Sequence, residues 1–407
     1  MSHNIANIEL ADAQIGVFNI RNLRHADWAV VLLTAILVFY GLLTLYHAVT
    51  ENDPAYHIHQ LMALPVGVFL ILLLLCMDSG FLVSLAPVFY MVSLFFLGAV
   101  VLWGDVAKGG QHWLSLGPVR FQPSEFSKVA LVYMLAWYLS RVGSERVRKL
   151  GWFLLTFVIT GATCGFILLQ EDLGTMTVLL PLPFVMLLVA GCRLRHLVAV
   201  LLLGAIVGGV AAPKVWAKLK PYQRARLVAF IYPEGGMKDT ELRKLRANFI
   251  EYIYPELDMK ETGYQLRQAQ IAIGSGRLTG KGYGEKTHAH LQFVPEYHND
   301  FIFAVLAEGD GFAGGIMAIG LFALLLVRSY FLAGDSDEMS SVLLITGCTT
   351  ILAVHAFMTI AIPLGLMPVT GLPLPFFSYG RSFYLVTMLC VGTILSANVR
   401  RKGMFDS

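Results

Sequence analysis

Ten stretches of mostly apolar residues, each long enough to cross a bilayer as a helix, dominate this sequence. A membrane-spanning helix needs about 20 such residues. The stretches lie near residues 28–48, 60–78, 82–103, 124–140, 152–169, 174–191, 197–213, 301–326, 340–362 and 380–398. Charged residues make up 14% of the 407-residue chain, against about 25% in soluble domains. The sequence therefore predicts an all-α polytopic membrane protein with ten transmembrane helices, forming a single membrane domain over residues 1–407.

The short loops differ in charge on the two sides of this predicted bundle. The basic residues collect on the side that holds both termini: Arg21, Arg24, Arg141, Arg146, Arg148, Lys149, Arg193, Arg195, Arg328, Arg400, Arg401 and Lys402. By the positive-inside rule this side is cytoplasmic. We therefore expect a cytoplasmic N-terminal segment, 1–27, a cytoplasmic C-terminus, and two outward segments. These are 104–123 and a long structured extracytoplasmic loop between helices 7 and 8, 214–300.

The charge and the cysteines exclude some partners. A net charge of +3 gives no indication of nucleic-acid binding. The five cysteines lie in or beside apolar stretches without paired metal-ligand spacing. We expect them to be buried as small apolar residues rather than to form disulfides or bind metal.

A carboxylate stands where the long polar loop meets the eighth span, in Pro295-Glu296-Tyr297-His298-Asn299-Asp300-Phe301-Ile302-Phe303-Ala304. An ionisable group at a membrane boundary suggests a functional site. Alternatively, Asn299 or Asp300 only caps the following helix. Glu308 lies eight residues later, on about the same face if the helix starts at Asp300. Its charge should face protein or a water-filled cavity, or be neutralised by protonation.

Other polar residues also stand at span boundaries. Glu125 and Lys128 are spaced to pair on one helix face, either lining a cavity or as a structural ion pair. Asp172, between spans five and six, is a functional carboxylate or a cap. The glycine-rich run 273–284 lacks the full phosphate-loop pattern. Two alternatives stay open: its amides bind a pyrophosphate together with Arg277 and Lys281, or the run forms only a set of turns. The irregular run 365–380 must be buried by protein or line a cavity.

These motifs together resemble the SEDS family (shape, elongation, division and sporulation) over nearly the whole chain. The matching residues are Trp113 with 116–117, 122–125 with Lys128, 172–175, 220–223, 263–265, 272–276, 295–296 with His298, 300–304 and 371–380. The triplet Gly280-Lys281-Gly282 is more similar to the elongation branch of the family than to its division branch.

The resemblance implies a peptidoglycan glycosyltransferase in the bacterial cytoplasmic (inner) membrane. It would polymerise lipid II on the outer side and release undecaprenyl diphosphate. Asp300 matches the family's essential aspartate and is expected to be the catalytic base. The expected substrate-binding residues are Glu125, Lys128, Asp172, Trp113, Arg277, Lys281, His298 and Ser378.

The resemblance also implies partners. A class B penicillin-binding protein would crosslink the strands, together with the elongation machinery and membrane lipid. No cofactor is required to activate the donor, since its diphosphate is already a leaving group. Whether a divalent cation, Mg²⁺ or Mn²⁺, assists stays open, and its ligands are unknown. The alternatives are a lipid II flippase, a non-enzymatic scaffold that activates the penicillin-binding protein, and a division-type polymerase.

Some positions depart from the family pattern. His112 replaces an Arg, Glu171 a Pro, Gly309-Asp310 a Glu-Leu pair, and Arg381 a Gly. For docking of the partner's helix we expect spans eight and nine, because the small residues 347, 350, 353 and 356 of span nine allow close helix approach.

Overall fold

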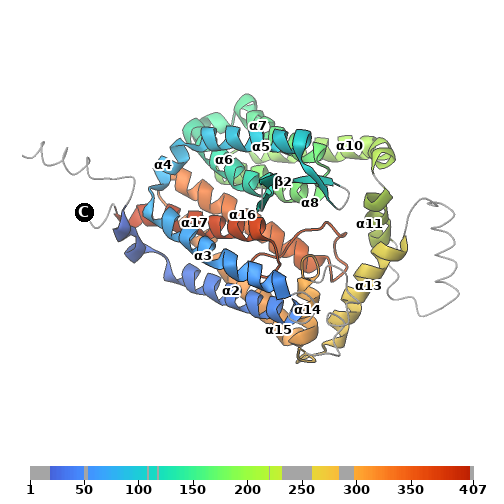
Figure 1. Cartoon of the computed structure of the whole chain (residues 1–407). Coiled ribbons are helices and arrows are strands. Elements are labelled where there is room, and N and C mark those ends of the chain that lie inside the picture. The colour runs from blue at the N-terminus through green and yellow to red at the C-terminus, as the bar shows by residue number, and fades with distance from the viewer. Residues whose placement is uncertain are drawn as a thin grey trace, which may run out of the picture.

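The computed structural model describes residues 19–49, 54–107, 110–116, 119–219, 221–231, 259–283 and 298–403. Helices pack along one another into a bundle, with α11, α13 and a small sheet at the end opposite the C-terminus (Figure 1). The elements are η1 (Ile20–His25), α2 (Trp28–Val49), α3 (Pro54–Cys76), α4 (Ser79–Ser84), α5 (Ala86–Trp103), β1 (Asp105–Ala107), β2 (Gly110–Leu116), β3 (Val119–Phe121), α6 (Pro123–Val147), α7 (Leu150–Leu169), α8 (Leu173–Leu179), α9 (Pro181–Val189), α10 (Leu194–Lys218), α11 (Pro221–Ile231), α13 (Met259–Ser275), α14 (Ile302–Gly309), α15 (Gly311–Gly334), α16 (Met339–Ala361) and α17 (Arg381–Gly403).

The ten predicted spans each coincide with helical structure. Among the described residues, eight helices are long and apolar enough to cross a membrane by length and composition. The fourth predicted span is α6, which carries charged residues, and the sixth is divided into α8 and α9, with a proline at the start of α9. The fold is therefore all-α and polytopic, and its helices are compatible with ten crossings. Of the predicted outer loop 214–300, residues 220, 232–258 and 284–297 lie outside the described residues.

A three-stranded antiparallel sheet adds to the predicted helical architecture. Its order is β1-β2-β3, with Asp105 opposite Trp113 and Leu114 opposite Phe121. It occupies the first predicted outward segment, between α5 and α6. These strands are only three to seven residues long, too short for apolar alternation to separate them from a loop.

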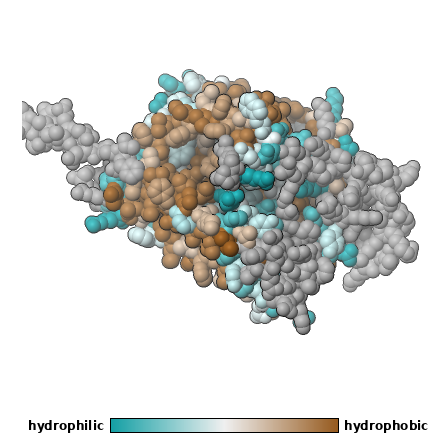
Figure 2. Space-filling view, in the orientation of Figure 1, coloured by the Kyte–Doolittle hydropathy of each residue, from teal (hydrophilic) through white to brown (hydrophobic). Residues whose placement is uncertain are grey.

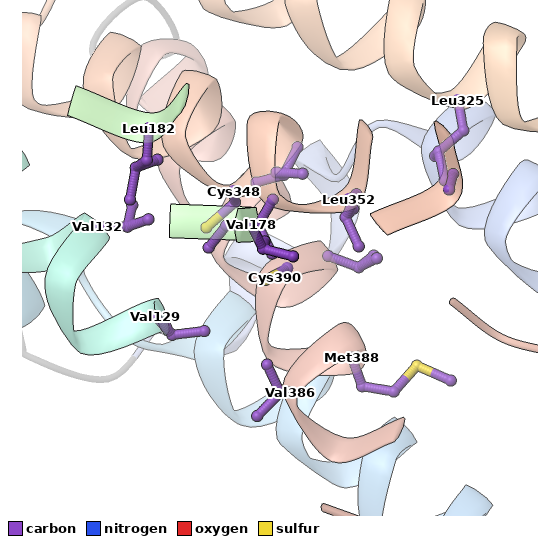
Figure 3. Packing of buried hydrophobic residues seen from close by; sticks show 14 of the residues in the cluster. Val129, Val132, Val178, Leu182, Leu325, Cys348, Leu352, Val386, Met388 and Cys390 are labelled. Carbon is purple, nitrogen blue, oxygen red and sulfur yellow. The ribbon is translucent and has the colours of Figure 1, made fainter. Parts of the chain in front are cut away.

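The interior of the bundle is formed mainly by α16 and α17. In their most apolar 18-residue stretches, 78% and 89% are buried within the protein. Figure 3 shows Val132 of α6 and Leu182 of α9 near Cys348 of α16. A Cβ added at Gly347 would lie 2.6 Å from the Val132 side chain. The small-residue face of span nine is thus used against α6, so the prediction that it docks a partner helix is wrong.

The outside of the bundle is broadly apolar, as Figure 2 shows by the brown surface over the helices. Exposed large hydrophobic side chains on several spans, such as Phe39, Phe69 and Phe331, fit a lipid environment. In the most apolar 18-residue stretch of α10, only 6% is buried within the described protein. The other described helices therefore cover very little of this helix. Four of the five cysteines are buried, as predicted, and Cys192 is partly buried.

Candidate functional site

The irregular segment joins α16 to α17, and its residues 372–378 are largely buried by protein, as one predicted alternative required, whereas Leu364, Leu366 and Gly371 are exposed. It turns at residues 375–378, and Phe376 there has a left-handed φ of 68°. Gly41 of α2 permits this turn to approach, since a Cβ at Gly41 would overlap the Phe376 carbonyl. Residues 375–378 therefore lie inside the bundle and contact helices from both halves of the chain.

This segment fixes the turn that carries Asp300. The Ser378 hydroxyl accepts from the Leu374 N–H (2.8 Å) and donates to the Asn299 carbonyl (2.6 Å). The Tyr379 N–H donates to the His298 carbonyl (3.0 Å). The backbone carbonyls of the two residues before Asp300 are therefore bound by the irregular segment. Ser378 is buried and its hydroxyl is fully engaged, so the structure assigns it to positioning this turn.

The ring of His298 is also engaged by protein. It stacks on Tyr56 of α3, with ring centres 4.5 Å apart and planes 12° apart. Tyr379 packs against the same tyrosine at 4.7 Å. His298 thereby ties the Asp300 turn to the end of α3.

Asp300 precedes the helix that it was expected to begin. The cap position of α14 is Phe301, and no side chain makes a capping hydrogen bond there. Neither Asn299 nor Asp300 is thus the cap. Because Asp300 lies in a turn, its supposed alignment with Glu308 on one helix face is also wrong.

Asp300 faces an arginine across Gly371. An Oδ2 atom of Asp300 and an Nη1 atom of Arg226 each lie 3.7 Å from the position of a Cβ at Gly371. Both side chains are partly buried. Gly371 has φ 76°, a conformation that glycine adopts without strain. A carboxylate and a guanidinium from α11 therefore share one face of the irregular segment.

Glu125 and Lys128 form a buried pair at the start of α6. Lys128 Nζ lies 2.7 Å from Glu125 Oε2 and 2.9 Å from Nε2 of His355 on α16. The Lys128 side chain has no exposed surface and that of Glu125 has 4%. Phe383 of α17 closes the site, 5.5 Å from the ammonium. The structure thus shows an enclosed pair, so contact with a substrate requires displacement of what covers it.

Asp172 caps α8 and also faces α6. Its Oδ1 accepts from the Thr175 N–H (2.9 Å), while its Oδ2 receives the Ser124 hydroxyl at 3.4 Å. The cap alternative therefore holds for one oxygen, and the second lies beside the residue that precedes Glu125. Gly174 contacts the irregular segment, since a Cβ there would lie 2.6 Å from the Thr370 carbonyl. Asp172 and Asp300 are thus linked through residues 370–371.

The departure at Glu171 has a backbone reason. Glu171 has φ 64° and ends α7 in a left-handed turn, with the Glu171 N–H on the Leu168 carbonyl (3.0 Å) and the Asp172 N–H on the Ile167 carbonyl (3.2 Å). These two bonds are those of a Schellman motif. Proline, fixed near φ −65°, cannot occupy this position, so the chain reaches Asp172 by a different turn from the family's Pro.

The glycine-rich run is a packed turn rather than an open phosphate cradle. Its Lys281 and Gly282 N–H groups donate to the carbonyls of Glu308 (3.0 Å) and Gly309 (2.9 Å). A Cβ at Gly280 would overlap the Gly309 carbonyl. These two amides are therefore used within the protein, which favours the alternative that the run forms a set of turns. The side chain of Arg277 is exposed.

Glu308 faces protein, as one of the predicted alternatives required. It is 1% exposed, and its Oε1 lies 3.2 Å from Lys281 Nζ and 3.2 Å from the Ser275 hydroxyl. Lys281 thus pairs with a buried carboxylate while keeping 38% of its side chain exposed. Trp113 lies in β2, partly buried, away from these contacts.

Two residues near the site were missed. Arg226 follows the motif 220–223 by one helical turn, and His355 is a lone ionisable residue inside an apolar span. His355 could have been found from the sequence, since ionisable residues are rare inside membrane spans and usually functional.

The helix directions place this site at one end of the bundle. Helices α6, α8, α14 and α17 begin there, and α2, α7 and α16 end there, so it lies opposite the termini. The fold and site define a polytopic membrane protein with an acidic and basic cluster at the end away from its termini. A family model described as "Cell cycle protein", for FtsW, RodA and SpoVE, matches residues 24–403. The chain belongs to this family, the SEDS proteins.

Individual relatives are similar over nearly their full length. The peptidoglycan glycosyltransferase MrdB of Escherichia coli (strain K12) is 31% identical over 386 residues, which cover 94% of this chain and 96% of MrdB. Stage V sporulation protein E of Bacillus subtilis (strain 168) is 29% identical over 387 residues, with coverages of 91% and 96%.

Solved structures share the fold. One, described as "Structural coordination of polymerization and crosslinking by a peptidoglycan synthase complex", has a TM-score of 0.74 at 30% identity, covering 92% of this chain and 98% of the other. The rod shape determining protein RodA of Thermus thermophilus has a TM-score of 0.65 at 29% identity, with coverages of 92% and 97%.

Proposed function

We propose that this protein is a peptidoglycan glycosyltransferase that polymerises lipid II into glycan strands during cell elongation. The site would face outward from the bacterial inner membrane, with both termini in the cytoplasm, because the basic loops lie on the terminal side. The observation that carries the proposal is the Asp300 carboxylate. It is held in a turn by two hydrogen bonds from residues 378–379, beside Arg226.

Asp300 acts as general base. It takes the proton from the 4-hydroxyl of the acceptor sugar while that oxygen attacks the anomeric carbon of the donor. The carbon–oxygen bond to the diphosphate breaks, and undecaprenyl diphosphate leaves with the electron pair. This single displacement inverts the anomeric carbon. A positioned base contributes about 10²–10⁴-fold to such a step.

Positive groups near the base would stabilise the negative charge that develops on the leaving diphosphate. Arg226 is the nearest candidate by position, and the first turns of α6, α8 and α14 lie at this end of the bundle, where helix dipoles favour anions. Arg277 and Lys281, with exposed surface, remain proposed contacts for the substrate. Such preorganised charges stabilise the transition state without solvent rearrangement.

Glu125, Lys128 and Asp172 form a second layer behind the irregular segment. Glu125 and Lys128 are enclosed, so they act on substrate only when the residues that cover them shift, whereas Asp172 is partly exposed. Trp113 belongs to the sheet that borders α6 and remains a proposed contact.

A protein-held cation is not part of this proposal. Within the part of the chain that the structure describes, no three His, Cys, Asp or Glu side chains are grouped to hold a metal ion. A divalent cation that assists would therefore be bound mainly by the diphosphate of the substrate.

A class B penicillin-binding protein is the proposed partner, acting with the elongation machinery. Its support is the similarity to a chain of a complex described as coordinating polymerisation and crosslinking. A division role is the alternative within the family, to which several relatives named FtsW belong. A flippase gains little support, since Glu308 is paired with Lys281 and Asp172 caps α8.

Polymerisation by the purified protein tests the proposal. The full chain in detergent micelles is incubated with lipid II, and the products are separated on a gel. A ladder of glycan strands is expected without any penicillin-binding protein present. Because micelles have no opposed leaflets, transport cannot produce it. A folded protein that yields no strands alone, but does yield them with a partner that has its own polymerase domain, would establish the scaffold alternative instead.

A further inference from the structure

A partly buried carboxylate lies at the break between α14 and α15. Asp310 occupies this break, where Gly311 has φ 69°. One oxygen of Asp310, Oδ2, accepts two phenol hydroxyls, those of Tyr40 (2.8 Å) and Tyr283 (2.8 Å). Tyr40 belongs to α2, and Tyr283 ends the described part of the outer loop. One carboxylate oxygen therefore joins three parts of the chain that are far apart in sequence.

The departures from the family pattern are the residues that make these contacts possible. Gly309 leaves room for the Tyr283 ring, whose Cζ would lie 2.5 Å from a Cβ added at Gly309. The other face of that ring stacks on His47 of α2, with ring centres 4.3 Å apart and planes 13° apart. The family's Glu-Leu pair at these positions would overlap the ring and remove the acceptor. Gly309 and Asp310 therefore act with Tyr283 as a set.

The same break is joined to the outer loop by backbone bonds. Besides the two amides that donate to Glu308 and Gly309, the Phe312 N–H donates to the Arg277 carbonyl (2.8 Å) and the Ala313 N–H to the Leu278 carbonyl (3.0 Å). Residues 277–282 thus run along the break. Glu308 pairs with Lys281, and Asp310 accepts the hydroxyl of Tyr283. Two neighbouring carboxylates therefore bind residues 281–283.

The phenols remain donors at all physiological pH values. Burial, followed by the hydrogen bond and charge of Asp310, raises the pKa of Tyr283 above its ordinary value. A raised phenol pKa keeps the proton on the oxygen, so Tyr283 continues to donate to the carboxylate.

We propose that Asp310, with Tyr40 and Tyr283, is a positioning site that sets the depth of Asp300 in the bundle. The helix α14 connects the two residues; it has eight residues, all buried, and a length of about 12 Å. A short helix packed on every side moves as a rigid unit, so its anchored C-terminal end fixes its N-terminal end. This inference rests on the proposed function in so far as Asp300 is the base.

Tyr283→Phe is the sharpest perturbation, because it removes one hydroxyl and keeps the ring that packs on Gly309. The matched control is Tyr138→Phe, which removes the buried hydroxyl that donates to the Trp152 carbonyl (2.8 Å), away from the site. Hydrogen exchange of the full-length protein in micelles is measured over residues 277–283, together with kcat and KM for lipid II polymerisation.

We expect exchange over 277–283 to become about tenfold faster in Tyr283→Phe, as fits the loss of a bond to a charged acceptor. We also expect kcat to fall by about threefold to tenfold, with KM within about twofold, since the base is displaced rather than the substrate surface. The control changes neither. Adding Tyr283→Phe to Asp310→Leu should have little further effect, because both changes break one interaction.

Equal exchange and equal kcat in Tyr283→Phe and the control would overturn the proposal. Faster exchange with parental kcat would overturn it as well, since the anchor would then not position the base. Additive effects in the double variant would show that Asp310 and Tyr283 do not act together, and would also overturn it. An inactive parent protein would refute the proposed function, and hydrogen exchange would still decide whether the anchor exists.

Discussion

Replacing Lys128 by Met separates a catalytic role of the buried pair from a purely structural one. Met keeps the length and apolar character of the side chain and removes the charge. Lys128 is wholly buried and its ammonium lies 2.7 Å from Glu125, so the substitution leaves a carboxylate inside the protein without its cation. Removing one partner of a buried ion pair costs about 3–5 kcal/mol. We therefore expect Lys128→Met to lower the thermal midpoint as well as the activity.

The double variant Glu125→Gln with Lys128→Met removes both charges at nearly constant volume. Neutral replacement of a whole buried pair is often neutral or stabilising, so we expect the midpoint to return close to that of the parent. The activity should stay lost if the charges act on the substrate. Thermal unfolding in micelles and strand formation from lipid II measure the two effects separately. A double variant that regains stability and polymerises at the parental rate would refute the catalytic role.

Three further predictions follow from particular backbone contacts. Glu171→Pro should destabilise by about 3 kcal/mol or more, since its φ of 64° excludes proline, while Glu171→Gly folds normally; thermal melts compare them. Gly280→Ala should lower the midpoint because its φ is 81° and its Cβ would meet a carbonyl of α14, whereas Gly274→Ala, with nothing within 4 Å, should not. Ser378→Ala leaves the partly buried Asn299 carbonyl without its hydroxyl donor, which costs about 1–3 kcal/mol. It should lower kcat more than it raises KM, and an unchanged kcat would contradict its positioning of Asp300.

Hydropathy located the spans because bilayer thickness imposes a minimum apolar length, but it did not locate helix ends. The fourth span was expected to end at residue 140, and α6 extends to Val147 with a kink at Gly143, whose φ is 71°; the eighth was expected to end at 326, and α15 continues to Gly334. Arg141 and Arg328 lie beyond the expected ends, where the chain turns polar while its helical bonds continue. The apolar part of a span is therefore readable from sequence, whereas the helix end depends on local backbone contacts.

The candidate site was predictable where a charge stood at a boundary and less so where contacts are tertiary. The position of Asp300 marked it as a candidate beside the alternative of a helix cap, but Arg226 comes from another element and was missed. For the glycine run the sequence left two alternatives open, because glycine serves both anion binding and close backbone approach. Only the structure shows that Gly280 is needed to fit against α14.

The central claim is that Asp300 is the general base, and Asp300→Asn tests it most directly. Asn keeps the size and hydrogen-bonding shape but cannot take up the proton. The matched control is Asp78→Asn, which neutralises the cap of α4 (accepting from the Phe81 N–H at 2.8 Å) at the opposite end of the bundle. With lipid II as substrate, we expect strand formation to fall by about 10²-fold or more in Asp300→Asn with an unchanged thermal midpoint, and to persist in Asp78→Asn. Parental strand yield from folded Asp300→Asn protein would contradict the account.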